Sequence, residues 1–250
     1  MLTRKDGGMT AGIIVAVLAL SGSAWSAPVT LYSTGFEAPE FSLGPIKDQN
    51  LWRVQGDTNN ANVVDYMAAG GSQSLRLDIP AYPENVYAGS WQKDWDWSPL
   101  DAGQTTVCVS AKVWVGSGGT TTQMAHYTDK GIVFINMQNG MVFANYWEPE
   151  RDLYLDGGIG LYHVEDWNDL TLTVDYLRQQ FEVTCEGVSF GLHDLPTDGP
   201  SSRFQGWSFG GIYGPRVSYV DDLNVTALPE PATLLFMVLG SCLMARHKRH

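Results

Sequence analysis

The stretch TTVCVSAKVWV, residues 105–115, decides the fold class of this chain. Every second residue from Val107 to Val115 is apolar, and the positions between them are occupied by Cys108, Ser110, Lys112 and Trp114. Successive side chains of a β-strand point to opposite faces of its sheet, so this alternation predicts a strand with one face in a core and the other toward water. A helix would need a period of about 3.6 residues, which this stretch lacks.

Runs of the same kind recur through most of the chain. They are SLRLDI (residues 74–79), IVFINMQNGMVFANYW (132–147), DLTLTVDY (169–176), QFEVTCEGVSF (180–190) and VSYVDDLNVT (217–226). Asn139-Gly140 and Glu186-Gly187 interrupt two of these runs with the residues that tight hairpin turns require. Since residues 28–229 contain no convincing helical period, the sequence predicts an all-β fold, a jelly-roll β-sandwich that forms one domain over residues 27–227.

Two of the three cysteines lie in this domain. Cys108 falls on the polar side of its alternation, whereas Cys185 is in phase with the apolar Phe181 and Val183. An oxidising compartment would permit a disulfide, but the two thiols are expected to face opposite ways. The opposite facing disfavours a bond between them.

The N-terminus has the layout of a secretory signal peptide. Arg4 and Lys5 supply a positive region, residues 11–20 are apolar, and the small-residue stretch SGSAWSA follows. Cleavage after Ser26 places small residues at the two positions that the processing peptidase reads. The sequence therefore predicts that residues 1–26 are a signal peptide and that the domain is secreted.

The C-terminus, LPEPATLLFMVLGSCLMARHKRH (residues 228–250), carries a second targeting pattern. Its apolar run of about fourteen residues is short of the roughly twenty that cross a bilayer comfortably, and its basic end would stay cytoplasmic. Pro229, Glu230 and Pro231, the apolar helix and the basic cluster together resemble the PEP-CTERM sorting signal of Gram-negative bacteria. The resemblance implies transient membrane anchoring, processing by an exosortase-type protease, and a place in an exopolysaccharide-rich envelope at the cell surface. An ordinary C-terminal anchor, or lipidation of Cys242, is the alternative.

The charge balance excludes one class of partner. The chain has 15 basic and 27 acidic residues, a net charge of −12, and both terminal segments contribute basic residues that processing would remove. Such a surface repels nucleic acid. An acidic secreted domain is compatible with bound calcium, although acidity also serves solubility.

The domain itself resembles the concanavalin A-like or laminin G-like group of extracellular jelly rolls. The resemblance rests on STGFEAPEFSLGPIKDQNLWRV near the start, GSQSLRLDI, DWNDLTLTVDY with FEVTCEGV in the middle, and VSYVDDLNVT at the end. Carbohydrate-binding modules of galactose-binding-like topology have similar openings and endings, so both topologies stay open. In such modules a Glu after a Gly-aromatic pair and an Asp in the final strand share a structural Ca²⁺, which implies Glu37 and Asp221 as ligands here.

The catalytic motifs of glycan-active enzymes are not evident. GWSFG (residues 206–210) matches the G-x-S-x-G nucleophile elbow, but it leads into another strand, and only His247 and His250 follow it. A jelly-roll glucanase would carry Glu-x-Asp-x-x-Glu along one strand face, and that string does not occur. These observations predict a non-catalytic protein, with a divergent glycoside hydrolase or polysaccharide lyase as the alternative.

Tryptophan supplies the candidate binding residues. In SWQKDWDWSP (residues 90–99), Trp95 and Trp97 alternate with Asp94 and Asp96. The rings can fill a core, or they can form an exposed platform for sugar rings whose hydroxyls bond to the carboxylates. The sequence therefore favours a surface protein that binds an extracellular polysaccharide through Trp95, Trp97, Asp94 and Asp96, with Trp91, Trp147 and Trp207 as further candidates in loops or at strand edges. A purely structural matrix protein is a further alternative.

Overall fold

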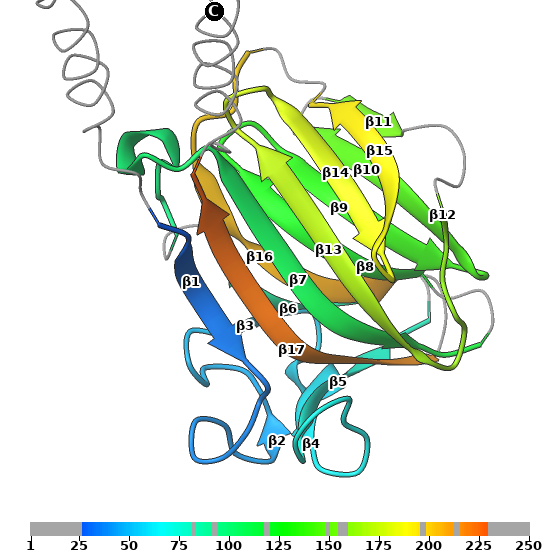
Figure 1. The fold of residues 1–250 in the computed structure, drawn as a ribbon. Helices are drawn as coiled ribbons and strands as arrows, with labels where there is room; N and C mark the ends of the chain where they lie inside the picture. Colours follow the sequence, from blue (N-terminus) through cyan, green and yellow to red (C-terminus); the bar gives the residue numbers. More distant parts are fainter. Residues whose placement is uncertain are drawn as a thin grey trace, which may run out of the picture.

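The computed structural model describes residues 27–81, 84–91, 95–117, 121–148, 151–154, 160–195, 199–212 and 216–229. Within them the chain forms two antiparallel β-sheets packed face to face (Figure 1). The predicted β-sandwich is therefore confirmed. The predicted signal peptide and the sorting segment from Glu230 onward lie outside the described residues. In the described part, no helix has the length and apolar character that crossing a bilayer requires.

Sheet A has the strand order β15-β14-β13-β7-β17-β5-β4-β2, and β1 also pairs with β17. Its strands are β1 (Val29–Thr34), β2 (Gly44–Pro45), β4 (Ala61–Val64), β5 (Ser74–Ile79), β7 (Thr106–Val115), β13 (Trp167–Asp175), β14 (Gln180–Cys185), β15 (Val188–Asp194) and β17 (Arg216–Leu228).

Sheet B has the order β11-β10-β9-β8-β16-β6-β3, and β12 pairs with β10. Its strands are β3 (Arg53–Gln55), β6 (Asn85–Trp91), β8 (Thr121–Thr128), β9 (Ile132–Gln138), β10 (Met141–Glu148), β11 (Arg151–Tyr154), β12 (Gly160–Leu161) and β16 (Phe204–Ile212). The single-turn 3₁₀ helices η1 (Thr58–Asn60) and η3 (Leu100–Ala102) lie between strands.

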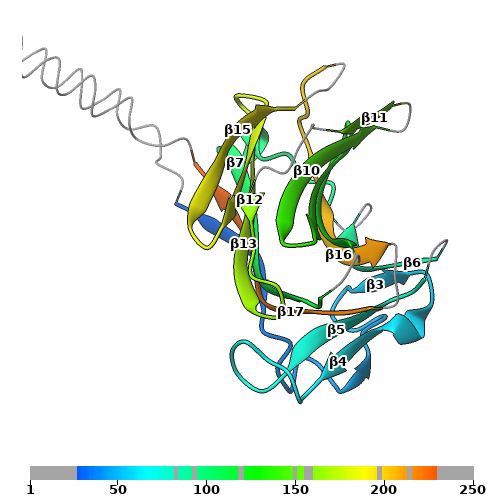
Figure 2. The same ribbon diagram turned by 90° about the vertical axis from the view of Figure 1, so that its right-hand side faces the viewer.

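The long strand β17 organises sheet A. It pairs with β7 along one side, and with β5 and then β1 along the other, and its register shifts between Asp221 and Asn224. Such a bulge bends a strand. In Figure 2, β17 curves beneath the sandwich. The next strands of sheet A, β5 and β4, therefore lie below sheet B.

The alternating runs and both hairpins are confirmed. The apolar positions of residues 105–115 face the core, and their polar neighbours are half-exposed. Asn139-Gly140 and Glu186-Gly187 join β9 to β10 and β14 to β15, and each residue has the positive φ that a two-residue hairpin turn needs. Cys185 is buried and Cys108 half-buried, and both are unpaired.

The core lies between the inner faces of the two sheets. It contains valines, leucines and isoleucines of sheet A together with large aromatic side chains, and Trp207 on β16 is among the largest that are fully buried. Burying this area supplies most of the stability of such a domain. The outward faces are therefore the surfaces left for binding.

Candidate functional site

Sheet B has an outward face that is hollowed. In β8, Met124 faces the core, so Gln123 on the opposite side must point away from it. Yet Gln123 is only 8% exposed, and Asn136, which also points outward from β9, is only 6% exposed. In Figure 2 the backbone of sheet B curves around this side, because β10 toward one end of the sheet and β6 and β3 at the other extend away from sheet A. We call the outward side of β6, β8, β9, β10 and β16 the concave face.

Small residues of β16 form the floor of the concave face. Gly206, Ser208 and Gly210 alternate there with the inward-facing Trp207 and Phe209. A Cβ on Gly210 would lie 2.4 Å from the Tyr87 ring, and a Cβ on Gly206, whose φ is +114°, would lie 2.1 Å from the carbonyl oxygen of Ser90. Only glycine fits such close approaches. The two glycines therefore let the Tyr87 ring and the Ser90 backbone lie directly against β16.

A chain of hydrogen bonds crosses the concave face. The Tyr87 hydroxyl donates to Oε1 of Gln123 at 2.7 Å, and Nε2 of Gln123 donates to Oδ1 of Asn136 at 2.6 Å. Among the described residues, nothing accepts a hydrogen bond from Nδ2 of Asn136. These hydrogen bonds fix the orientation of both amides, because they occupy both polar atoms of Gln123 and the oxygen of Asn136. They leave donor capacity at the end of the chain for a bound molecule.

Aromatic rings flank this polar chain. The rings of Trp91 and Tyr127 stack with centroids 6.1 Å apart and planes inclined by 19°, and the Tyr127 hydroxyl bonds to Oγ of Ser208 at 2.9 Å. Burial raises the pKa of Tyr127, so its hydroxyl stays protonated at neutral pH. Phe134 and Phe143 are half-buried on the same face. Flat apolar rings beside amides and hydroxyls suit a ligand that is apolar on one side and rich in hydroxyls at its edge.

The structure places Trp95 at the edge of the core rather than on the concave face. Its ring lies 4.9 Å from that of Trp207 and 6.0 Å from that of Phe204, and its Nε1 donates to Oγ of Ser90 at 2.7 Å. These contacts match the core-filling interpretation of this tryptophan.

The other residues predicted with Trp95 are only partly brought together. Trp97 is half-buried, packs against the core and pairs through its backbone with Phe204. Asp96 is exposed and forms an ion pair of 3.1 Å with Arg203. Asp94 lies outside the described residues. The glycan contact predicted for this group stays a prediction, and the concave face is a larger candidate.

The GWSFG motif lies wholly within β16. Ser208 is fully buried in the middle of the strand. A nucleophile elbow instead places its serine on a sharp turn between a strand and a helix. The motif therefore lies inside a strand that the sequence analysis did not predict, and the next strand along the chain is β17.

Glu37 and Asp221 come together at the loop between β4 and β5. Oε1 of Glu37 accepts from the N–H groups of Ser72 and Gln73, at 2.7 and 2.9 Å, and Oδ2 of Asp221 accepts from those of Ala69 and Gly70, at 2.8 and 3.0 Å. Bonds from the hydroxyl and N–H of Ser72 and the N–H of Gln73 lower the pKa of Glu37, and burial raises that of Asp221. The two carboxylates therefore hold this loop against β17.

The predicted calcium ligands lie near Gly35. A Cβ on Gly35 would lie 3.6 Å from Oδ1 of Asp222 and 3.8 Å from both Oδ1 of Asp221 and Cγ of Glu37, so three acidic side chains surround this glycine. No group of three His, Cys, Asp or Glu side chains placed to hold a metal occurs in the part of the chain that the structure describes. Calcium needs six to eight oxygens, and backbone carbonyls would have to supply most of them.

The calcium prediction has a direct test. If Glu37 and Asp221 share an ion, a chelator should lower the melting temperature of the calcium-loaded protein, because a ligand bound only to the native state stabilises it. Glu37→Gln should abolish this response. An unchanged melting temperature in differential scanning calorimetry would mean that the two carboxylates act on the loop alone.

Comparisons with known proteins identify the fold. No family model matches the chain, and no curated protein matches it. A solved carbohydrate esterase from the Shiga toxin-encoding bacteriophage phi24B has a TM-score of 0.54 at 14% identity, over 81% of this chain and 100% of that one. The binding domain of botulinum neurotoxin DC in complex with SialylT has a TM-score of 0.51 at 10% identity, over 85% of this chain and 51% of that one.

The chain thus spans about half the length of this neurotoxin structure. Likeness at such identities shows the fold alone, a two-sheet β-sandwich. The choice between concanavalin A-like and galactose-binding-like topology stays a prediction.

Proposed function

We propose that this protein is a non-catalytic, glycan-binding β-sandwich whose binding site is the concave face. The observation that carries the proposal is the combination of stacked Trp91 and Tyr127 rings with the hydrogen-bond chain from Tyr87 to Asn136 on one hollowed surface. A pyranose ring presents C–H groups on its faces and hydroxyls at its edge. The rings would contact the C–H groups, and the amides would bond the hydroxyls.

Charge further specifies the ligand. None of the outward side chains described on β6, β8, β9, β10 and β16 is charged, and the chain as a whole carries −12. A net negative charge raises the energy of bringing a polyanion to the surface. The ligand that fits is therefore a neutral polysaccharide.

The similar solved structures support this proposal at the level of the fold. They include a protein named as a carbohydrate esterase and a neurotoxin binding domain in complex with SialylT. A β-sandwich of this kind can thus serve proteins that handle carbohydrate, although fold alone does not assign function.

The proposal includes export and sorting. Residues 1–26 act as the signal peptide, and residues 228–250, with Pro229, Glu230 and Pro231, act as a PEP-CTERM signal for an exosortase-type protease. The domain then reaches the cell surface or the exopolysaccharide layer, where a glycan ligand is available. The support for this part is the order of the sequence patterns at the two ends of the chain.

Replacing Trp91 by alanine tests the site. If its ring stacks on a sugar, the affinity for a neutral polysaccharide should fall by about 5- to 150-fold, which corresponds to about 1–3 kcal/mol per stacked ring by analogy with bases on aromatic side chains. The melting temperature should change little, because Trp91 is half-buried. Affinity electrophoresis in gels containing the polymer measures the first quantity, and calorimetry the second.

Trp97→Ala is the matched control, since Trp97 is also half-buried but lies outside the concave face. It should leave affinity within about twofold. Loss of binding in Trp97→Ala but not in Trp91→Ala would move the site to residues 94–97. Release of reducing ends or unsaturated sugars by the wild-type protein would place it among the enzymes.

A further inference from the structure

The outward face of sheet A carries a separate row of aromatic side chains. Trp167 on β13, Trp114 on β7 and Tyr219 on β17 lie directly opposite one another in the register of three neighbouring strands. All three are half-exposed, and the rings of Trp114 and Tyr219 are 5.4 Å apart. We call these residues the aromatic row. It lies on the other side of the sandwich from the concave face.

The ring of Trp114 lies over the backbone of a neighbouring residue, Gly116. Its six-membered ring covers Gly116, with Cζ3 lying 3.5 Å from where a Cβ on that glycine would be. Tyr66, which is 60% exposed, meets Tyr219 edge to face at 6.4 Å and extends the row beyond β17. Half-exposed aromatic rings grouped on one face of a monomer mark an interaction site more often than isolated apolar residues do.

The cations that border the row are paired. Arg76, opposite Tyr219, forms an ion pair with Asp78, and Lys112, two residues before Trp114, forms one of 2.6 Å with Asp169. Glu165 and Asp166, which precede Trp167, are exposed acids. Among the described residues, the row therefore has no free cation to attract a polyanion, and a neutral ligand fits it better.

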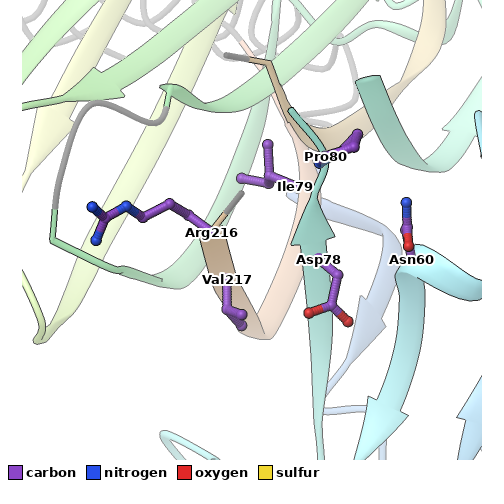
Figure 3. Close-up of a pocket in the computed structure, with 6 residues that line it drawn as sticks. All are labelled: Asn60, Asp78, Ile79, Pro80, Arg216 and Val217. Carbon is purple, nitrogen blue, oxygen red and sulfur yellow. The ribbon is translucent and has the colours of Figure 1, made fainter. Parts of the chain in front are cut away.

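A pocket of about 280 Å³ adjoins the end of the row (Figure 3). Asp78 and Val217 line it from paired positions on β5 and β17, two residues, or about 7 Å, along the strands from Arg76 and Tyr219. The rest of its lining is Asn60, Ile79, Pro80 and Arg216, so the pocket has one cationic and one anionic side chain. Figure 3 shows the Asp78 and Val217 side chains pointing to the same side, with Asn60 on the neighbouring segment. The volume is near the lower end of ligand pockets, which suits one sugar unit.

Asn60 gives this pocket unused hydrogen-bonding capacity. It ends the short helix η1, whose start is capped by Asp57 through a 2.9 Å bond from the N–H of Asn59. The Asn60 side chain is half-buried, and its amide has no hydrogen-bond partner among the residues that the structure describes. An amide offers both a donor and an acceptor, and a neighbouring carboxylate accepts hydroxyl hydrogens. This pairing suits adjacent hydroxyls of a sugar.

We propose that the aromatic row and the pocket formed by Asn60, Asp78 and Val217 are a second binding surface for a neutral polysaccharide. The surface goes beyond the proposed function, because it shares no residue with the concave face. If both faces bind, one domain holds two glycan chains on opposite sides and links them. Linking would make the protein a cross-bridge of its matrix, with an avidity that neither face has alone.

The test uses the full chain in three forms: wild type, Trp91→Ala on the concave face, and Trp114→Ala in the row. Each is titrated by calorimetry with soluble oligosaccharides of a neutral β-glucan and a galactomannan, and with an oligogalacturonate as the acidic probe. The wild type should bind two molecules of a neutral oligosaccharide, and each variant one. Asn60→Ala, which alters no core contact, should weaken the second site about five- to tenfold.

Asn224→Ala is the control for Asn60→Ala, since Asn224 is a half-buried asparagine farther along the outward side of β17. It should leave both sites unchanged.

A single wild-type site that Trp114→Ala leaves intact would overturn the second surface and leave the concave face as the binding site. A single site that only Trp114→Ala removes would support the row and overturn the concave face. Preference of the row for oligogalacturonate would overturn this proposal. If no probe binds at all, both this proposal and the proposed function are wrong.

Discussion

Replacing Trp207 by alanine should lower the free energy of unfolding by about 3–5 kcal/mol, the cost typical of removing a large aromatic side chain from a core. Trp207 is 0% exposed, and its ring lies 4.9 Å from those of both Tyr32 and Trp95. It therefore joins β16 of sheet B to β1 of sheet A and to the segment that carries Trp95. Equilibrium denaturation in urea measures the change.

Trp207→Phe is the matched control, because it keeps an aromatic ring and removes less volume. It should cost clearly less than Trp207→Ala. Nε1 of Trp207 has no hydrogen-bond partner among the described residues, so losing the indole nitrogen should not add a penalty. A loss below about 1 kcal/mol in Trp207→Ala would contradict the core position given to this side chain.

Lowering the pH from 7 to 4 should cost about 3 kcal/mol of stability through His126 alone. This side chain is fully buried between the sheets, and burial lowers its pKa to about 3. An unfolded histidine titrates near 6.5, so the unfolded state takes up a proton first as the pH falls. The contribution is fully present above about pH 6.5 and is lost as the pH falls toward 3.

His126→Gln separates this effect from other titrations. Nε2 of His126 meets the Tyr176 hydroxyl at 2.8 Å, and a glutamine amide can keep a hydrogen bond there without titrating. Glu37 and Asp129, whose pKa values hydrogen bonds lower, lose their contributions as the pH falls below the ordinary carboxyl range in both proteins. Urea denaturation at pH 7 and pH 4 should therefore show a smaller loss in the variant. Equal losses would mean that His126 accepts a proton in the folded protein.

The strands that the sequence predicted share one physical property. In β5, β7, β13, β14 and β17 one face is filled with apolar side chains and the other is mostly polar, so the period of two is visible in hydrophobicity. The strands β9 and β10 were predictable from their apolar content and the Asn139-Gly140 turn between them. The two hairpin turns could also be predicted from the sequence, because a positive φ at both central residues strongly restricts the residue types.

The centre of sheet B was not predicted, because its outward face is not polar in the usual sense. β8 and β16 are buried on nearly both faces, and glycine, serine, threonine and glutamine stand where charged residues mark an exposed face. The signal was present in GWSFG, where small residues alternate with Trp207 and Phe209. Trp207 is a candidate for stacking by sequence, but the structure buries its ring completely in the core.

Most of the candidate site was missed for the same reason. Tyr87, Trp91, Gln123, Tyr127 and Asn136 come from three strands, and only the pairing of those strands brings them onto one face. Of these residues, the sequence indicated Trp91 alone. Local alternation also favours Trp95, because alternation cannot tell an outward ring from one that folds back onto the core.

Glu37 and Asp221 both bond to the loop between β4 and β5, and their sharing of a calcium ion stays a prediction.

Glycan binding at the concave face is tested most directly by nuclear magnetic resonance of the protein titrated with a neutral oligosaccharide. The indole N–H of Trp91 and the backbone amides of Ser208 and Gly210 should shift with ligand, while the indole of Trp207 should not. Shifts confined to the indoles of Trp95 and Trp97, or no shift with any oligosaccharide, would contradict glycan binding at the concave face.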